Sequence, residues 1–131
     1  TSFVDTRQLT SYVADGLIAS TATGSTAYAL AAGGPILPPE LRNILLVPIA
    51  PHLSVDRAVV LSEGSSVKII VKSENAVLSV DGQPPSPLME DDVVNVTAAD
   101  VTAQFVRFGD PGYFYRNLTA HMNENSLGFP R

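Results

Sequence analysis

The stretch DGLIASTATGSTAYALAAGGP, residues 15–35, decides how this chain folds. Its first part, GLIAS (16–20), is a short apolar run typical of a β-strand, and the Gly, Ser and Thr residues after it favour a tight turn. The run TAYALAA (26–32) is dense in strong helix formers, and the Gly-Gly-Pro that follows ends a helix. The stretch therefore predicts a strand, a turn and one short helix, with Ser25 or Thr23 as its cap.

The same stretch offers the elements of a binding surface. Small side chains let a ligand approach the backbone, and the free N–H groups at the start of a helix favour anions and hydrogen-bond acceptors. Tyr28 adds an aromatic ring and a hydroxyl, and Asp15 adds a carboxylate that can accept from an amide or from ribose hydroxyls. A plain helix cap has the same composition, so the residues alone leave a ligand site and a cap as equal alternatives.

Three sharper motifs are absent from the sequence. No Lys follows Gly24, as a Walker A loop requires, and neither the Gly-x-Ser-x-Gly nucleophile elbow nor the Gly-x-Gly-x-x-Gly dinucleotide fingerprint occurs. His52 and His121 are far apart and have no spacing typical of a metal site or a catalytic base. The stretch is therefore interpreted as a binding surface rather than a mount for a nucleophile.

Beyond residue 35, the patterns of β-strands dominate and predict an antiparallel sandwich or barrel. The expected strands are 43–50, 66–73, 76–83, 92–99 and 101–108. A short turn at 73–75 predicts that the second and third of these form a hairpin, and Asp81-Gly82 is a type I′ turn signal. The prolines of QPPSPL (83–88) restrict that segment to a loop or an edge strand.

Composition narrows the class of protein. The chain has 131 residues, a net charge of −5 and no cysteine, which suits one globular domain without disulfides or thiolate metal sites. Its basic residues are scattered, which argues against a nucleic-acid partner, and no apolar run is long enough for a membrane helix. A cytoplasmic setting is expected. The first residue is not Met, and we expect the chain to be part of a longer protein.

Several blocks of the sequence resemble the NAD kinase family. YVADGLIASTATGSTAYALAAGGPILPP is similar to that family's Asp-Gly-x-x-x-Ser-Thr-Pro-Thr-Gly-Ser-Thr-Ala-Tyr signature with its following Ala-Gly-Gly-Pro-Ile. LLVPIAPH, RAVVL, SVDGQ and VRFGDPGYFYRNL follow in the family's order, so the resemblance covers nearly all of residues 3–118. Two positions depart from the family's pattern: Ala22 stands where Pro is usual, and Ala31 where Ser is usual.

The resemblance implies a function for a longer protein. NAD kinases transfer a phosphoryl group from ATP or polyphosphate, with a divalent cation such as Mg²⁺, to the adenosine-ribose 2′-hydroxyl of NAD. Their catalytic Asp lies in a Gly-Gly-Asp-Gly motif of an N-terminal domain, and this sequence lacks that motif. The resemblance thus implies the C-terminal, mainly β, sandwich-like domain over 1–118, with a polar tail at 119–131 that packs on the missing domain. No catalytic residue is expected here, and the chain alone is expected to be inactive.

The resemblance also implies where NAD binds. Asp15 is expected near the nicotinamide end with Val13 along the same wall, and Ala50 lines the pocket from a neighbouring strand. The helix start is expected to contact ribose and the carboxamide through Thr26, Ala27, Tyr28 and Ala31, and Gln83 contacts the dinucleotide from a hairpin. In this family the NAD site lies between subunits of a dimer or tetramer, so self-association is expected.

Two alternatives stay open at the level of sequence. A lipid kinase of the diacylglycerol or sphingosine type has a related architecture but does not usually carry TGSTAY. A non-catalytic β-sandwich that binds a nucleotide as a sensor, or only mediates assembly, is the other alternative. Sequence upstream of Thr1 would discriminate the enzyme from the sensor.

Overall fold

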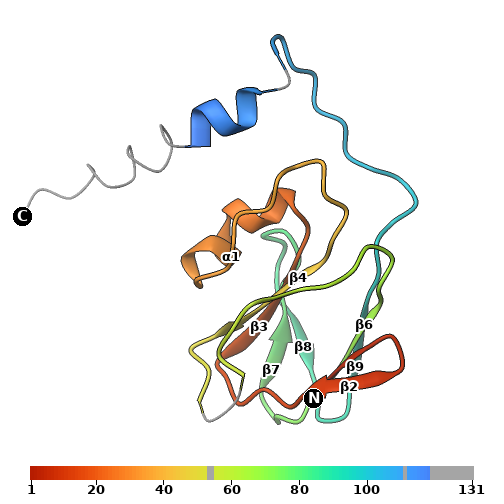
Figure 1. The fold of residues 1–131 in the computed structure, drawn as a ribbon. Coiled ribbons are helices and arrows are strands. Elements are labelled where there is room, and N and C mark those ends of the chain that lie inside the picture. The colour runs from red at the N-terminus through yellow and green to blue at the C-terminus, as the bar shows by residue number, and fades with distance from the viewer. Residues whose placement is uncertain (53–54, 111, 119–131) are drawn as a thin grey trace, which may run out of the picture. The chain divides into compact units, whose positions relative to one another are not determined.

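The computed structural model describes residues 1–52, 55–110 and 112–118 (Figure 1). The chain divides into two compact units, residues 1–99 and 100–131, and each is described by itself. All paired strands are antiparallel and lie in the first unit. The predicted mainly β, antiparallel class is thus confirmed.

Three sheets make up the first unit. The four-stranded sheet has the order β2 (Arg7–Thr10), β1 (Ser2–Val4), β6 (Val67–Ile70), β9 (Val93–Val96). The three-stranded sheet has the order β3 (Gly16–Ser20), β4 (Leu45–Ile49), β5 (Val59–Val60), and a two-stranded sheet pairs β7 (Ala76–Leu78) with β8 (Ser86–Leu88). Two short helical turns, η1 (Thr23–Thr26) and α1 (Tyr28–Ala31), follow β3.

The central strand, β4, is buried on both faces. Leu45 and Val47 pack in one apolar cluster with Ala29 of α1, whereas Leu46 packs in a second cluster with Val67 of β6. Successive residues of a strand point to opposite faces, so β4 divides a helix–sheet core from a sheet–sheet core. This explains why its sequence is a continuous apolar run rather than an alternating one. The strand predicted over 43–50 is confirmed.

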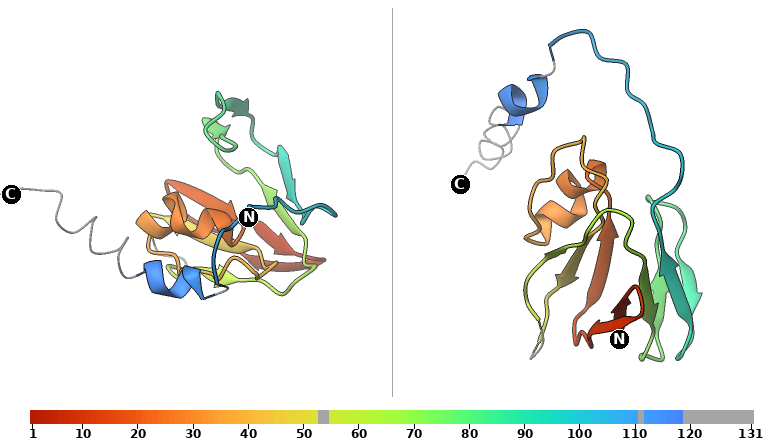
Figure 2. Two further views of the ribbon diagram at one scale, coloured as in Figure 1. Left: turned by 90° about the horizontal axis from the view of Figure 1, so that it is seen from above. Right: turned by 45° about the vertical axis from the view of Figure 1, so that its right-hand side comes forward.

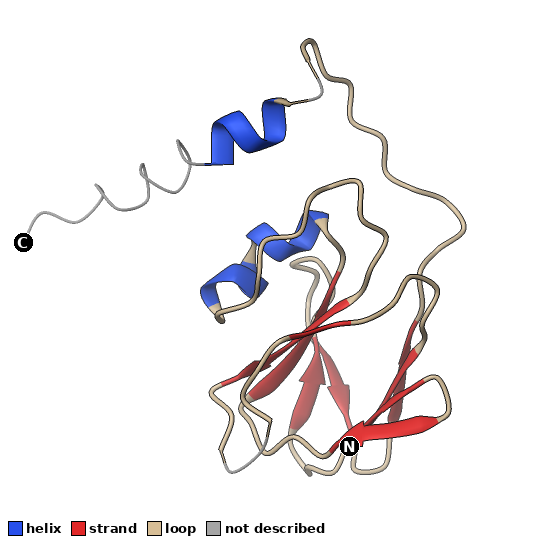
Figure 3. Cartoon of the chain, in the orientation of Figure 1, coloured by secondary structure: helices blue, strands red, loops and turns tan. Residues whose placement is uncertain are grey.

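The strand GLIAS has the predicted bounds, but the helix after it differs from the prediction. Instead of one helix over 26–32, a 3-10 turn and a single α-turn are separated by Ala27, whose ψ of −128° is not helical (Figure 3). Gly33 has a φ of +87° and ends the segment as predicted. Neither turn has a side-chain cap, so the capping role predicted for Ser25 or Thr23 is wrong.

Ser25 instead ties the helical turns to the following loop. Its side chain is fully buried, its hydroxyl donates to the Ala22 carbonyl at 2.6 Å, and its oxygen accepts from the Leu37 N–H at 3.0 Å. Ala22, at the start of η1, has a φ of −55°, which proline also adopts. The backbone of this bend is therefore compatible with the Pro that the resemblance leads one to expect there.

The predicted hairpin between 66–73 and 76–83 is wrong. β6 pairs with β1 and β9, and β7 pairs with β8. The turn that the sequence did identify, Asp81-Gly82, has φ angles of 48° and 72° and joins β7 to β8, as a type I′ turn requires. Pro87 lies in β8, a strand at the edge of its sheet, in agreement with the expectation for 83–88.

The second unit carries a further correction. Residues 101–108 alternate like a strand, but they form none, and Figure 3 draws them as a loop. Alternation indicates a strand only where another strand can satisfy its backbone, and none of the described residues pairs with this segment. Residues 113–118 are helical. The predicted tail, 119–131, lies outside the described residues, and no helix in the described part is long and apolar enough to cross a membrane.

Replacing Ser25 tests how much its buried hydroxyl stabilises the bend. In Ser25→Ala, the Leu37 N–H loses its buried acceptor, whereas the Ala22 carbonyl still accepts from the backbone N–H of residue 25 at 3.2 Å. One unsatisfied buried group costs about 1–3 kcal/mol, so we expect the free energy of unfolding, measured by urea denaturation, to fall by about that amount. The matched control is Thr26→Ala, because Thr26 is exposed and its hydroxyl bond is 3.4 Å long. Equal losses in the two variants would contradict this role.

Candidate functional site

The start of β3 and the end of β4 bring three of the predicted site residues together. The Asp15 N–H donates to the Ile49 carbonyl at 2.9 Å, and the His52 N–H donates to the Val13 carbonyl at 2.7 Å. These bonds continue the β3–β4 ladder beyond its last assigned pair, so Val13, Asp15 and Ala50 lie beside one another. Asp15 is thus held by the sheet and is not part of a plain turn.

Ala50 has an unusual backbone conformation. Its φ is +45°, a region that non-glycine residues seldom adopt and that costs roughly 1–3 kcal/mol. Strained residues of this kind cluster at functional sites, where the surrounding structure holds them in place. The strain at Ala50 falls at a residue that was expected to line the pocket. No pattern in the sequence signals it, since Gly rather than Ala marks such positions.

The second group of predicted residues lies on the helical turns that follow β3. All four are exposed: Thr26, Ala27, Tyr28 and Ala31. The Tyr28 side chain is 62% exposed, whereas its neighbour Ala29 is 1% exposed and fills the contact with the sheet. Tyr28 is therefore not a core residue of the sheet–helix contact and presents its ring to the surroundings.

The helical turns do not form the anion-binding helix start that the sequence predicted. α1 is a single turn of four residues, and its N-cap residue, Ala27, donates its own N–H to the Gly24 carbonyl. A helix this short has little macrodipole, because the dipole is the sum over aligned peptide units. A ligand at these turns would therefore meet exposed side chains and individual backbone groups rather than a helix dipole.

The two groups stand toward opposite ends of β3. The group of Val13, Asp15 and Ala50 precedes the first residue of that strand or pairs with it, and the group at 26–31 follows its last residue. Five extended residues span about 16 Å. Figure 1 shows the helical turns at the end of the β3–β4 pair where β3 finishes. Within one copy of the chain, the two groups therefore lie toward different ends of β3.

Gln83 is apart from both groups. It follows the Asp81-Gly82 turn at the tip of the β7–β8 hairpin, with its N–H bonded to the Val80 carbonyl at 2.9 Å. Figure 2 shows this hairpin projecting from the two larger sheets. Its side chain is exposed.

Two residues near the first group were missed or set aside at the level of sequence. His52 lies beside Val13 through its backbone N–H, which only the β3–β4 register reveals. The Tyr12 hydroxyl is buried and has no hydrogen-bond partner among the described residues. Burial raises the pKa of the Tyr12 phenol above its ordinary value, so the group stays neutral at physiological pH.

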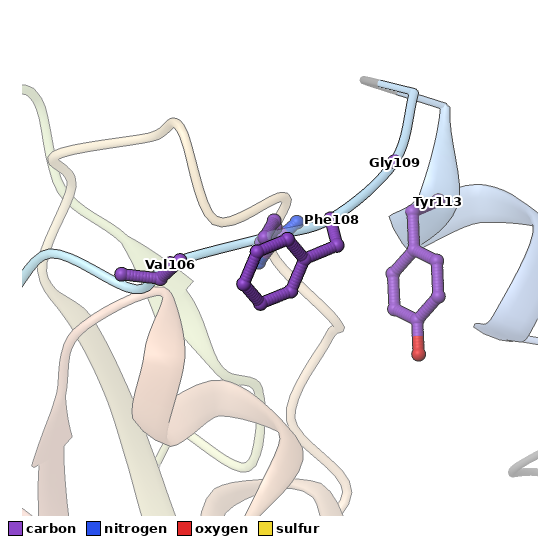
Figure 4. Close-up of a pocket in the computed structure, with 5 residues that line it drawn as sticks. Val106, Phe108, Gly109 and Tyr113 are labelled. Atoms are coloured by element: carbon purple, nitrogen blue, oxygen red, sulfur yellow. The ribbon is translucent and has the colours of Figure 1, made fainter.

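Other features of the described residues do not add to this site. A hollow of about 320 Å³ lies in the second unit, where Val106, Phe108, Gly109 and Tyr113 line it (Figure 4). It contains none of the predicted site residues, and the Phe108 side chain is 98% exposed. Across residues 1–52, 55–110 and 112–118, no three His, Asp or Glu side chains gather as a metal site would need.

Comparison with known proteins gives one consistent result. Residues 2–108 match the family model described as the ATP-NAD kinase C-terminal domain. The chain is 47% identical over 105 residues to an NAD kinase of Heliobacterium modesticaldum and 44% identical over 123 residues to one of Chloroflexus aurantiacus, covering 79% and 93% of this chain. It spans 37% and 45% of those relatives, that is, less than half of their length.

Two solved structures resemble the fold. A yeast NADH kinase crystallised with NADH is 29% identical, with a TM-score of 0.75 over 99% of this chain and 41% of that one. An NAD kinase from Archaeoglobus fulgidus in complex with ATP is 31% identical, with a TM-score of 0.76 over 93% of this chain and 46% of that one.

Gly34 sets how closely the helical turns approach β4. A Cβ atom at Gly34 would lie 2.8 Å from the Ala29 carbonyl oxygen and 2.8 Å from Cγ2 of Val47. We therefore expect Gly34→Ala to lower the free energy of unfolding by about 1–3 kcal/mol, because overpacked cores must shift backbone. Chemical denaturation measures this. At the control position, Gly64, a Cβ meets nothing within 4 Å, so Gly64→Ala reports only the cost of its positive φ. A Gly34→Ala variant as stable as the parent would contradict this packing.

Proposed function

The chain belongs to the ATP-NAD kinase C-terminal domain family, and on that premise we propose that it is the NAD-binding part of an NAD kinase. The longer protein would transfer a phosphoryl group from ATP or polyphosphate to the adenosine-ribose 2′-hydroxyl of NAD. The match over residues 2–108 carries this proposal. The NADH and ATP in the two solved relatives support the classes of substrate.

The chain's own role in this reaction is to position the dinucleotide. Asp15 would accept a hydrogen bond at the nicotinamide end, beside Val13 and Ala50. Thr26, Ala27 and Tyr28 would contact ribose and the carboxamide, with Ala31 one turn further and Gln83 on the hairpin. All eight residues are exposed, which such contacts require. Because Ala31 has no hydroxyl, its side chain offers van der Waals contact only.

We propose that two copies of the chain share each NAD site. Since Asp15 and Tyr28 stand toward opposite ends of β3, their side chains converge most simply when the two come from different copies. A homo-oligomer, a dimer or a tetramer, would bring the end of one β3 to the start of another. The arrangement would also explain why the binding side chains are exposed in a single copy.

The remaining parts of the site belong to the part of the longer protein that this chain does not span. Phosphoryl transfer needs a carboxylate at the ribose hydroxyl and a divalent cation on the phosphates. The described residues do not fit a cation site, because their carboxylates do not cluster. We therefore propose that this other part of the longer protein holds Mg²⁺, the phosphoryl donor and the catalytic carboxylate. We also propose that the protein acts in the cytoplasm. We also propose residues 1–118 as the domain and 119–131 as its contact with that part.

The isolated chain is expected to be inactive. A purified sample of the 131 residues, supplied with NAD, ATP or polyphosphate and Mg²⁺, should form no NADP in a coupled dehydrogenase assay, because it positions one substrate only. The positive control is the full-length enzyme of a relative. NADP formation by the chain alone would contradict the division of labour proposed above.

Mixing two variants of the longer polypeptide tests the shared site. Asp15→Ala and Tyr28→Ala should each raise the KM for NAD by about 10–100-fold with a smaller effect on kcat, because both residues bind rather than react. If a site combines Asp15 of one copy with Tyr28 of another, unfolding and refolding the two variants together restores about a quarter of the normal sites.

The control mixes Asp15→Ala with an Asp15→Ala, Tyr28→Ala double variant, a pair in which no intact site can form. It should restore nothing. Equal activity in the test and control mixtures would overturn the shared site. Unchanged KM values in both single variants would instead overturn the assigned binding residues.

A further inference from the structure

A projecting arm, residues 72–90, connects β6 to β9 and carries β7 and β8. Backbone bonds close its base: the Val71 N–H donates to the Asp92 carbonyl at 2.9 Å, and the Asp91 N–H donates to the Val71 carbonyl at 2.8 Å. An ion pair between Lys72 and Asp91 lies at the same point. Seen from above in Figure 2, the arm stands away from both larger sheets.

The arm exposes several large apolar side chains. None of its residues is buried, and Val77 and Met89 are 64% and 75% exposed. Val80 and the prolines at 84, 85 and 87 are exposed as well. A two-stranded hairpin by itself is marginally stable in water and needs further strands or a covering layer. The described residues of the first unit supply neither, so we expect the arm to have a partner outside that unit.

The register of the hairpin determines which edge is open. Pro87 is opposite Val77 and has no N–H, so these two residues cannot exchange ladder bonds. Bonded and non-bonded pairs alternate in an antiparallel ladder, which places the bonds at the neighbouring pairs, Ala76–Leu88 and Leu78–Ser86. The N–H and C=O of Val77 therefore face outward. On β8, the matching residue is Pro87, which has no N–H to donate outward.

The open edge suits an identical strand. Residues 75–80, NAVLSV, contain no charge and no proline, two of the devices by which proteins protect an edge from pairing. An uncharged edge gives a basic or acidic partner nothing to complement. Two copies aligned antiparallel about Val77, in contrast, meet without like charges and form a self-complementary contact about a two-fold axis.

We propose that β7 pairs with β7 of a second copy, with Val77 opposite Val77, to form a four-stranded sheet across the two chains. This deepens the proposed function, and it rests on that function in so far as the shared NAD site requires a second copy. The Val77 N–H and C=O bond to those of the other Val77, and Asn75 faces Ser79 on either side. The apolar side chains of the two arms then cover one another.

The test is the mass of the 131-residue chain by sedimentation velocity at tens of micromolar, without NAD. The parent chain should be a dimer or larger. Val77→Pro removes the outward N–H without breaking a ladder bond within the hairpin, and Val77→Glu places like charges across the two-fold axis. Each should weaken association by at least about tenfold and leave the far-ultraviolet circular dichroism unchanged.

Val60→Glu on β5 is the matched control, because Val60 is 45% exposed and lies on another sheet. It should associate like the parent. A monomeric parent chain would overturn the proposal and assign the arm to another partner, such as the rest of the longer polypeptide. Val77 variants that keep the parent's mass, or a control that dissociates equally, would also overturn it. Dinucleotide binding is measured separately, so its failure would contradict the proposed function and leave this contact standing.

Discussion

The antiparallel pairing of β3 with β4 is the contact on which the rest of the first unit depends. It runs without a bulge from Gly16–Ile49 to Ser20–Leu45. Because β4 is buried on both faces, a slip of one residue would exchange its helix-facing and sheet-facing side chains and disrupt two cores at once. The register is therefore strongly determined, and with it the position of every residue at either end of β3.

That register separates the proposed binding residues into two groups. It holds Asp15 beside the strained Ala50 at one end and leads the chain into the exposed helical turns at the other. The two groups are separated by β3, whose five residues span about 16 Å, and the strand that β3 pairs with, β4, is buried in two cores and resists bending. In the proposed oligomer, a second copy would join the two groups without deforming either. The separation of the two groups thus follows from the register that stabilises the sheet.

The sequence predicted the elements whose cause is local. GLIAS, the Asp81-Gly82 turn and the Gly33 stop were found because strand pattern and left-handed backbone leave direct marks on residue type. Alanine propensity predicted one continuous helix, whereas the non-helical backbone of Ala27 interrupts it. The pairing of β6 with β1 and β9 depends on Val67 packing with residues far along the chain, which no local turn signal reports. Likewise, no residue pattern reveals that Asp15 and Tyr28 stand apart.

Residues 101–108 and the β7–β8 arm both show that a stable strand needs pairing as well as burial. A strand is a property of a pair: residues 101–108 have the alternation but no partner among the described residues, and they stay irregular with Phe105 and Phe108 exposed. The arm has its pair but no covering layer among the described residues of the first unit, and it keeps its ladder while Val77 and Met89 are exposed. Alternation supplies a face, pairing satisfies the backbone, and burial stabilises the result. Where strand pairing or burial is missing within one chain, contact with another polypeptide surface can supply it.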